Sequence, residues 1–296
     1  MRLLPLLLLA ATSLCAQRTV FLDADTANEV DDLYAIVRAF AEPNWRIPVL
    51  ASAQWQNSMW ATAQTNEDSY RLNQTLAAHL GVQDSTDVVR GGHRRMYDWR
   101  HMAIHSHATD KLIRMARAAT PEDKLTVVVL GALTNLGSAL YLAPDIAGRI
   151  EVYWLGSTYD FATDRAGLTD FNALMDPQAA KIVLEHPTLR VHVLPVSEVG
   201  AFSVAYADVA AVVEGRGRLG KLLLDRWHNH FDGVTSARVL WDVAIVELLA
   251  DPSYATEVAA PGYGGANVTA YRNLRGEALF ARALARTGEH LQTLSN

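Results

Sequence analysis

Four aspartates stand close together near the start of the chain, in the segment VFLDADTANEVDDLYAI: Asp23, Asp25, Asp31 and Asp32. The first two follow an apolar stretch that predicts a buried strand, and the last two open a helical pattern. Because like charges held within a few ångströms raise one another's pKa, such a group is costly without a cation. A hard divalent cation prefers carboxylate oxygens as ligands. The segment therefore predicts a metal site that can hold a water molecule and lower its pKa.

The residues alone leave two other interpretations of these aspartates open. Asp31 and Asp32 could simply cap the helix that follows, because carboxylates are favoured at helix amino termini. A phosphatase with an aspartyl nucleophile also begins with a strand that ends in Asp-x-Asp. Such an enzyme would not need the adjacent Asp31 and Asp32, so the four residues together favour the metal site.

The elements that would position these residues alternate between strands and helices. Near-continuous apolar stretches, typical of strands buried on both faces, recur along the chain and several are followed by helical periodicity. Strands are expected at 19–22, 46–53, 125–130, 149–155 and 189–194, and helices at 31–40, 136–142, 177–184, 236–249 and 277–291. Residues 226–231 are expected to be irregular, and 261–268 to form a loop or hairpin. The alternation predicts an α/β fold with a mainly parallel, Rossmann-like central sheet and helices on both faces.

Composition and charge narrow the class of protein. The chain has 296 residues, of which 50% are hydrophobic, and a formal net charge of −6. That length is enough to bury one large core. The acidic balance argues against a nucleic-acid polymer as partner. Cys15 is the only cysteine, so stability has to come from the core rather than from disulfides.

The amino-terminal segment has the features of an exported leader. Arg2 precedes the leucine-rich run 3–11, and small residues follow up to Ala16. The apolar run is shorter than the ~20 residues that a membrane span needs. We therefore expect residues 1–16 to be a cleaved signal peptide and residues 17–296 to form one catalytic domain. The mature protein would then be secreted or periplasmic, with no membrane attachment.

Three further segments, taken together with the aspartates, resemble the motifs of a known family. They are LGALTNLGSALYLAPDI at 130–146, DFNALMDPQAAKIV at 170–183 and WDVAIVELLADP at 241–252. In this order the four motifs are similar to those of the inosine–uridine nucleoside hydrolases. The resemblance implies the nucleoside hydrolase fold and a Ca²⁺-dependent glycosidase. Such an enzyme cleaves the N-glycosidic bond of a small-molecule ribonucleoside to free base and ribose, as in purine salvage, and commonly forms a homo-oligomer.

The resemblance also implies a role for each matched residue. The implied metal ligands are Asp25, Asp32, the main-chain carbonyl of Leu130, and Asp242. Asp25 would in addition be the catalytic base that takes a proton from the attacking water. The implied substrate-binding residues are Asp23, which would also support the metal ligands, Asp31 on the ribose hydroxyls, Asn57, Asp170, Asn172 and Trp241.

Three departures from the family pattern bear on the substrate. Five residues, Thr26 to Val30, separate Asp25 from Asp31 where the family has three, so Asn28 or Glu29 can face the site. Ala132 replaces the proline of Gly-Pro-Leu-Thr-Asn, which is a backbone detail. Trp241 replaces the usual histidine and resembles purine-preferring members, in which an aromatic residue stacks on the base.

The group that protonates the departing base is left open. His228 and His230 are the candidates for this acid, although each could equally be an exposed loop residue, and Trp241 could equally be a core residue. A hydrolase of a different or modified N-riboside and a non-catalytic sugar-binding relative also remain alternatives. Retention of Asp25 beside the implied metal ligands favours an enzyme.

Overall fold

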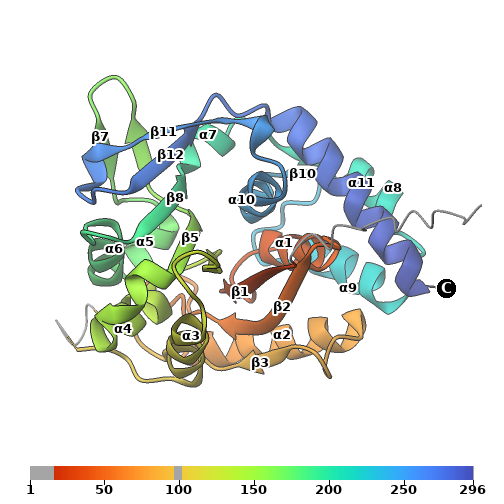
Figure 1. Cartoon of the computed structure of the whole chain (residues 1–296). Coiled ribbons are helices and arrows are strands. Elements are labelled where there is room, and N and C mark those ends of the chain that lie inside the picture. The colour runs from red at the N-terminus through yellow and green to blue at the C-terminus, as the bar shows by residue number, and fades with distance from the viewer. Residues whose placement is uncertain (1–16, 97–101, 296) are drawn as a thin grey trace, which may run out of the picture.

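A computed structural model describes residues 17–96 and 102–295 of the chain. The predicted signal peptide at 1–16, with Cys15, lies outside the described residues, which are the coloured part of Figure 1. Among the described helices, none combines the length and the apolar character that a membrane crossing requires.

Within the described residues, eight strands form the central sheet. In spatial order they are β11 (Thr256–Ala259), β12 (Val268–Arg272), β8 (Arg190–Leu194), β5 (Ile150–Leu155), β4 (Leu125–Val129), β1 (Arg18–Ala24), β2 (Trp45–Ser52) and β3 (Asp87–Val89). All neighbours are parallel except β11, which runs antiparallel to β12 at one edge. Two short antiparallel pairs lie apart from this sheet: β6 (Thr158–Asp160) with β7 (Arg165–Gly167), and β9 (Val204–Ala205) with β10 (Ala237–Arg238). The predicted mainly parallel α/β fold is confirmed.

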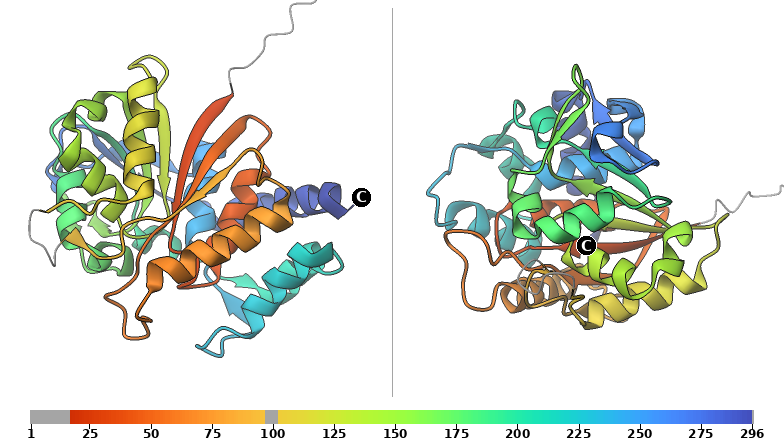
Figure 2. Two further views of the ribbon diagram at one scale, coloured as in Figure 1. Left: turned by 90° about the horizontal axis from the view of Figure 1, so that it is seen from below. Right: turned by 90° about the vertical axis from the view of Figure 1, so that its left-hand side faces the viewer.

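Helices cover both faces of the sheet. The α-helices are α1 (Asp31–Phe40), α2 (Thr65–Leu80), α3 (His107–Ala118), α4 (Thr134–Leu142), α5 (Phe171–Met175), α6 (Pro177–Leu184), α7 (Val196–Val199), α8 (Tyr206–Val213), α9 (Gly217–His228), α10 (Trp241–Ala250) and α11 (Gly276–Ser295). Short 3₁₀ turns are η2 (Pro144–Arg149), η3 (Pro252–Tyr254) and η4 (Pro261–Tyr263). Helices α1, α2, α10 and α11 pack on one face, and α3, α4 and α6 on the other (Figure 1). Figure 2 shows α8 and α9 as an outer layer, and they pack against α11 and α2.

The chain changes direction at β1, and this places the site. From β1 it proceeds outward through β2 to β3, and it then returns to β4 on the other side of β1. In open parallel sheets, ligands bind at such a switch point, beyond the carboxyl ends of the two strands. Asp25 follows the end of β1 and Leu130 follows the end of β4.

The sequence of strand β1 is almost continuously apolar because the strand is buried on both faces. Phe21 packs into the core on the α3–α4 face, whereas Val20 and Leu22 pack into the core on the α1–α10 face. All three are fully buried, because successive side chains of a strand point to opposite faces and helices cover both. Each contributes about 1.5–3 kcal/mol of burial free energy.

Two expectations about the carboxy-terminal half are wrong. The helix expected at 236–249 begins at Trp241, because residues 237–238 pair with β9 as strand β10. Residues 226–228, expected to be irregular, complete helix α9. That helix buries Leu219, Leu223 and Trp227 at helical spacing, but the charged residues between them hide the pattern.

A buried ion network joins the helices behind the site. Arg38 of α1 donates from Nε to Glu247 of α10 at 2.6 Å, and both side chains are fully buried. Arg282 of α11 also contacts Glu247, and Glu42 lies 3.4 Å from Arg38. Because buried charges are costly unless they are paired, this network fixes how α1, α10 and α11 pack.

Replacing Arg38 by methionine tests this network. The change leaves the Glu247 carboxylate buried with only Arg282 as partner, so the free energy of unfolding should fall by about 3 kcal/mol. Arg71→Met is the matched control, because the Arg71 side chain is 70% exposed in its pair with Glu67; its effect should stay below about 1 kcal/mol. Urea unfolding measures both, and equal effects would contradict a structural role for the buried network.

Candidate active site

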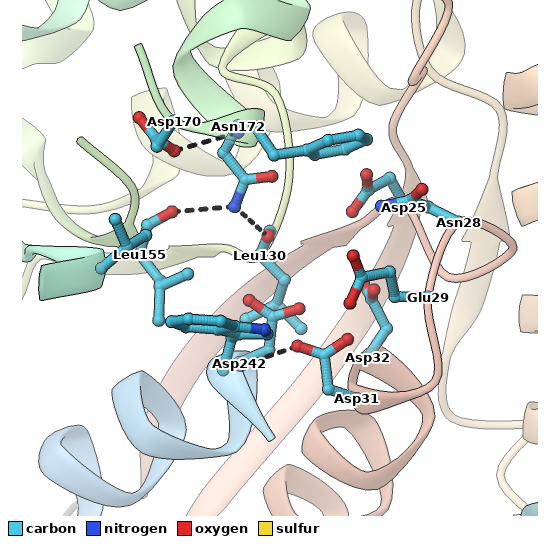
Figure 3. Close-up of a pocket in the computed structure, with 13 residues that line it drawn as sticks. Asp25, Asn28, Glu29, Asp31, Asp32, Leu130, Leu155, Asp170, Asn172 and Asp242 are labelled. Carbon is cyan, nitrogen blue, oxygen red and sulfur yellow. Dashed lines mark hydrogen bonds between the residues drawn. The ribbon is translucent and has the colours of Figure 1, made fainter. Parts of the chain in front are cut away.

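A pocket of about 300 Å³ opens at the carboxyl ends of the central strands. It is drawn in Figure 3 and is lined by Asp25, Asn28, Glu29, Asp31, Asp32, Leu130, Leu155, Asp170, Phe171, Asn172, Val196, Trp241 and Asp242. The lining residues come from the loop after β1, the ends of β4 and β5, and the starts of α1, α5, α7 and α10. Segments far apart in the sequence therefore meet at one point.

The loop between β1 and α1 is held by polar contacts on its outer side. The backbone N–H of Asn28 donates to the carbonyl of Asp25 at 2.8 Å, and the Thr26 hydroxyl donates to Asn73 at 2.6 Å. Trp60 Nε1 donates to the Asn28 side chain at 3.0 Å. These contacts leave both Asn28 and Glu29 in the pocket lining, as the longer spacing between the aspartates suggested.

The amino termini of α1 and α10 converge on the pocket. Asp31 and Asp32 lie in the first turn of α1, and Asp242 lies in the first turn of α10. One carboxylate oxygen from each of the three lies within 4.8 Å of the others. The backbone N–H of Asp242 donates to Asp31 Oδ2 at 3.1 Å and so joins the two helix ends directly.

Three carboxylate oxygens in the pocket have no protein partner. Oδ2 of Asp25, Oδ1 of Asp32 and Oδ1 of Asp242 are buried and accept no hydrogen bond, and the three residues are only 1–3% exposed. Burial, together with the neighbouring carboxylates, holds the pKa of each well above its usual range. Buried acceptors without donors cost free energy, and a cation between them removes that cost. A divalent metal ion therefore fits these residues.

The neighbouring carboxylates have smaller shifts. Burial and the charge of Asp31 raise the pKa of Glu29 to about 7. Burial also raises the pKa of Asp31 to about 6, while backbone hydrogen bonds, that from Asp242 first, oppose the rise. Asp31 is therefore partly satisfied by the protein itself, unlike the three residues with orphaned oxygens.

The main chain after β4 supplies a further oxygen. The carbonyl of Leu130 lines the pocket and accepts from Asn172 Nδ2 at 2.8 Å, which leaves its second lone pair available. A Cβ atom at Gly131 would lie 2.5 Å from Asp25 Oδ1, so only glycine lets the main chain approach this closely. With carboxylate and carbonyl donors alone, the site suits a hard cation of the Ca²⁺ or Mg²⁺ type.

Asp170 and Asn172 form the opposite side of the pocket. Asp170 caps helix α5 by accepting from the backbone N–H of Asn172 at 3.0 Å. Asn172 Nδ2 also donates to the carbonyl of Leu155, at 2.9 Å. These bonds fix Asn172 with its amide oxygen free to face a ligand, as Figure 3 shows.

Two predicted substrate-binding residues lie outside the pocket lining. Asp23 is buried beneath the site and accepts from Asn135 Nδ2 at 2.9 and 3.0 Å. Burial raises the pKa of Asp23 to about 7 despite the Asn135 hydrogen bond. Asp23 thus supports the end of β1. Asn57 is exposed, and its amide donates to the carbonyl of Leu174 at 2.9 Å.

Neither of the predicted leaving-group acids lines the pocket. His228 ends α9, is exposed, and lies 4.5 Å from the Tyr206 ring. His230 is 7% exposed and lies 3.8 Å from an oxygen of Asp232, and burial lowers its pKa. His228 therefore contacts helix α8, and His230 contacts its own loop, rather than the pocket.

Several pocket residues have no signal of their own in the sequence. Phe171 lines the pocket and stacks on Trp60, with ring centroids 5.7 Å apart and planes 15° apart. Leu155 and Val196 add apolar walls. Phe171 stands within the Asp-Phe-Asn motif, so its position could have been found; the other two look like ordinary core residues.

Comparison with known proteins agrees with this geometry. Residues 5–280 match the family model described as inosine-uridine preferring nucleoside hydrolase. This chain belongs to that family. The resemblance to the nucleoside hydrolases is therefore confirmed. The matched residues include all four motifs: the aspartates, the segment after β4, the Asp-Phe-Asn motif and the start of α10.

Individual relatives are more distant. An inosine-uridine preferring nucleoside hydrolase of Leishmania major is 25% identical over 185 residues, which cover 56% of this chain and 56% of that protein. The alignment thus spans about half the length of this relative. Among solved structures, a plant nucleoside hydrolase has a TM-score of 0.70 at 18% identity and covers 93% of this chain and 99% of its own. A purine-preferring ribonucleoside hydrolase from Gardnerella vaginalis has a TM-score of 0.70 at 16% identity, covering 93% and 100%. These two structures show the shared fold.

Exchanging Asp242 for asparagine tests the metal site, because the variant should be the more stable protein without Ca²⁺ and the less stable one with Ca²⁺. Without divalent cations, Asp242→Asn should be more stable than the original chain, because it removes a buried charge that repels its neighbours. With Ca²⁺ at about 100 times its dissociation constant, the original chain should gain about 2.7 kcal/mol, or roughly 5–10 °C in Tm. The variant should gain little.

Thermal unfolding with and without Ca²⁺ measures this inversion. Asp84→Asn, at an exposed position far from the pocket, serves as the control and should behave like the original chain. A Tm of the original chain that does not respond to Ca²⁺ or Mg²⁺ would rule out the proposed ligand set.

Proposed function

We propose that this protein hydrolyses the N-glycosidic bond of ribonucleosides in a Ca²⁺-dependent reaction and prefers purine nucleosides. The observation that carries the proposal is the set of orphaned carboxylate oxygens on Asp25, Asp32 and Asp242. They share one pocket with the Asn172 amide and with aromatic side chains. Such a site can hold a cation, a water molecule, a sugar and a flat base together, and family membership supports this chemistry.

The attacking half of the reaction rests on Asp25. When bound, Ca²⁺ would supply positive charge that lowers the pKa of a nearby water and attracts sugar hydroxyls. Asp25, Asp32, Asp242 and the Leu130 carbonyl would hold the ion. Asp25 would accept the proton as the water attacks the anomeric carbon, since its Oδ2 has no competing donor in the protein.

The sugar would lie between two groups of polar residues. Asp31 would accept hydrogen bonds from ribose hydroxyls beside the metal, and Asp170 and Asn172 would contact the sugar from the other side. Holding the sugar at both ends fixes the anomeric carbon against the attacking water, which is a proximity contribution to the rate. The hydrogen bonds within the protein that fix Asn172 prepare this geometry before the substrate binds.

The base would lie against the aromatic wall. Trp241 is partly exposed in the pocket, where the edge of its indole would lie 3.2 Å from a Cβ atom at Gly200. A side chain at 200 would therefore push the indole by a few tenths of an ångström from its present position. Stacking on Trp241 favours bicyclic bases and is the basis for the proposed purine preference.

Export by way of segment 1–16 and assembly into a homo-oligomer stay predictions from the sequence.

A substrate panel tests the activity and the base together. In the presence of Ca²⁺ we expect ribose release from inosine, adenosine or guanosine above that from uridine and cytidine, and loss of all activity with a chelator. Asp25→Asn should lower turnover by at least about 100-fold, the contribution of a general base, with unchanged circular dichroism. No release from any of the five, with metal bound, would favour a modified N-riboside or a sugar-binding role.

Trp241→Ala tests the stacking role. The variant should raise KM or lower kcat/KM for purine nucleosides by about tenfold, in line with the loss of about 1–2 kcal/mol of aromatic contact. Pyrimidine nucleosides should be affected less. Trp45→Ala, at the far end of β2, provides a control for general loss of aromatic packing. Equal losses for both substrate classes would mean that Trp241 only supports the core.

A further inference from the structure

Acidic side chains far outnumber basic ones in the pocket lining. Its acidic lining residues are Asp25, Glu29, Asp31, Asp32, Asp170 and Asp242, and the described lining holds no lysine, arginine or histidine. One divalent ion would offset two of these charges. The remaining field attracts positive charge, and a pocket with low-dielectric walls concentrates that field.

Glu29 is the carboxylate that the metal and the sugar do not account for. It is partly buried and lines the pocket, and it forms no hydrogen bond or ion pair with any other described residue. Figure 3 shows its carboxylate directed between Asp25 and Asp31. Glu29, Asp31 and Trp241 also line a second hollow, to which Arg238 contributes as well. Glu29 therefore stands on the side where Trp241 receives the base.

The basic side chain that acts on Glu29, Arg238, forms no ion pair with it. Arg238 lines a hollow together with Glu29 and contributes to the field around it. Its Nε is buried without a partner in the described part of the chain, and its two terminal nitrogens are bonded elsewhere. They donate to Asp232 at 2.6 and 2.8 Å, and to the carbonyls of Val234 at 2.6 Å and Trp227 at 3.3 Å. None of these bonds reaches Glu29, so the Glu29 carboxylate has no ion-pair partner among the described residues.

Aromatic faces stand beside this charge. Trp241 and Phe171 both line the pocket, and Phe171 is backed by Trp60. Phe231 extends the same wall, with its ring centroid 5.2 Å from that of Trp60. A flat cation is stabilised by aromatic faces, and more so when it is desolvated. Carboxylate and aromatic rings together form a receptor for a flat, positively charged ring.

The chemistry of departure agrees with this charge pattern. When the bond from the anomeric carbon to nitrogen breaks, both electrons go to the nitrogen, and water adds to the carbon and loses a proton to Asp25. A neutral base would leave as an anion and needs a proton, but neither His228 nor His230 lines the pocket. A base that already carries a positive charge becomes neutral on departure and needs no acid.

Building on the proposed function, we propose that this pocket also accepts N-ribosides whose base carries a fixed positive charge, such as a pyridinium, and that Glu29 is the residue that recognises the charge. Glu29 belongs to the five-residue loop between Asp25 and Asp31, and this loop brings its side chain to the pocket.

A double comparison tests the proposal on the Ca²⁺-loaded protein at pH 7.5. Nicotinamide riboside is the cationic probe and inosine the neutral one, and the quantity measured is the ratio of their kcat/KM values. Glu29→Gln should lower this ratio by about tenfold, because it removes one charge at contact distance and keeps the shape. Glu122→Gln, exposed at the opposite end of the sheet before β4, should leave the ratio unchanged.

A salt series on the unaltered protein gives a second readout that needs no variant. Raising the ionic strength screens charge attraction, so KM for nicotinamide riboside should rise while KM for inosine stays constant. If inosine is hydrolysed but neither the ratio nor the salt response depends on charge, the inference about cationic substrates is wrong and the proposed function stands. If ribose is released from neither substrate, both are wrong.

Discussion

The mutual repulsion of buried carboxylates is the constraint on which the rest of this structure depends. Asp25, Asp32 and Asp242 hold oxygens that are shielded from water and receive no hydrogen bond, so the folded chain carries an electrostatic cost at its centre. The core must offset that cost until a cation binds. Arg38 and Glu247, by contrast, are buried as an ion pair. The contrast marks the pocket as the place where stability is given up for binding and chemistry.

The surrounding architecture lowers this cost and keeps it in place. The amino termini of α1 and α10 both point at the pocket, and their partial positive charge favours carboxylates there. Behind the pocket, Arg38 and Glu247 fasten the same two helices to each other. The carboxylates are therefore presented by elements that cannot separate to relieve the repulsion. Gly131 completes the arrangement by letting the main chain lie against Asp25.

Much of this could be predicted from the sequence because the signals were local. The apolar run at β1 and the adjacent aspartates indicated a buried strand followed by a charged helix start, and both occur where expected. Asp23, Asn57 and the two histidines could not be placed in this way, because the direction of a side chain depends on partners distant in sequence. Asp23 is turned toward Asn135, which lies 112 residues later. The start of α10 also differs from the sequence prediction, since the pairing of β10 with β9 overrides the helical pattern of residues 236–240.

The site is divided between the two ends of the chain, and this affects how the protein is made. Asp31, which precedes the proposed ligand Asp32, is 211 residues from Asp242, so the first proposed ligands leave the ribosome long before the last one exists. Chains grow from the amino terminus, and early segments can fold before the later ones are synthesised. Here the early segment would expose acidic groups with no complete set of ligands around a cation. The full proposed set of ligands would exist only after Asp242 has been synthesised, so binding of the cation by this set would require a chain of nearly full length.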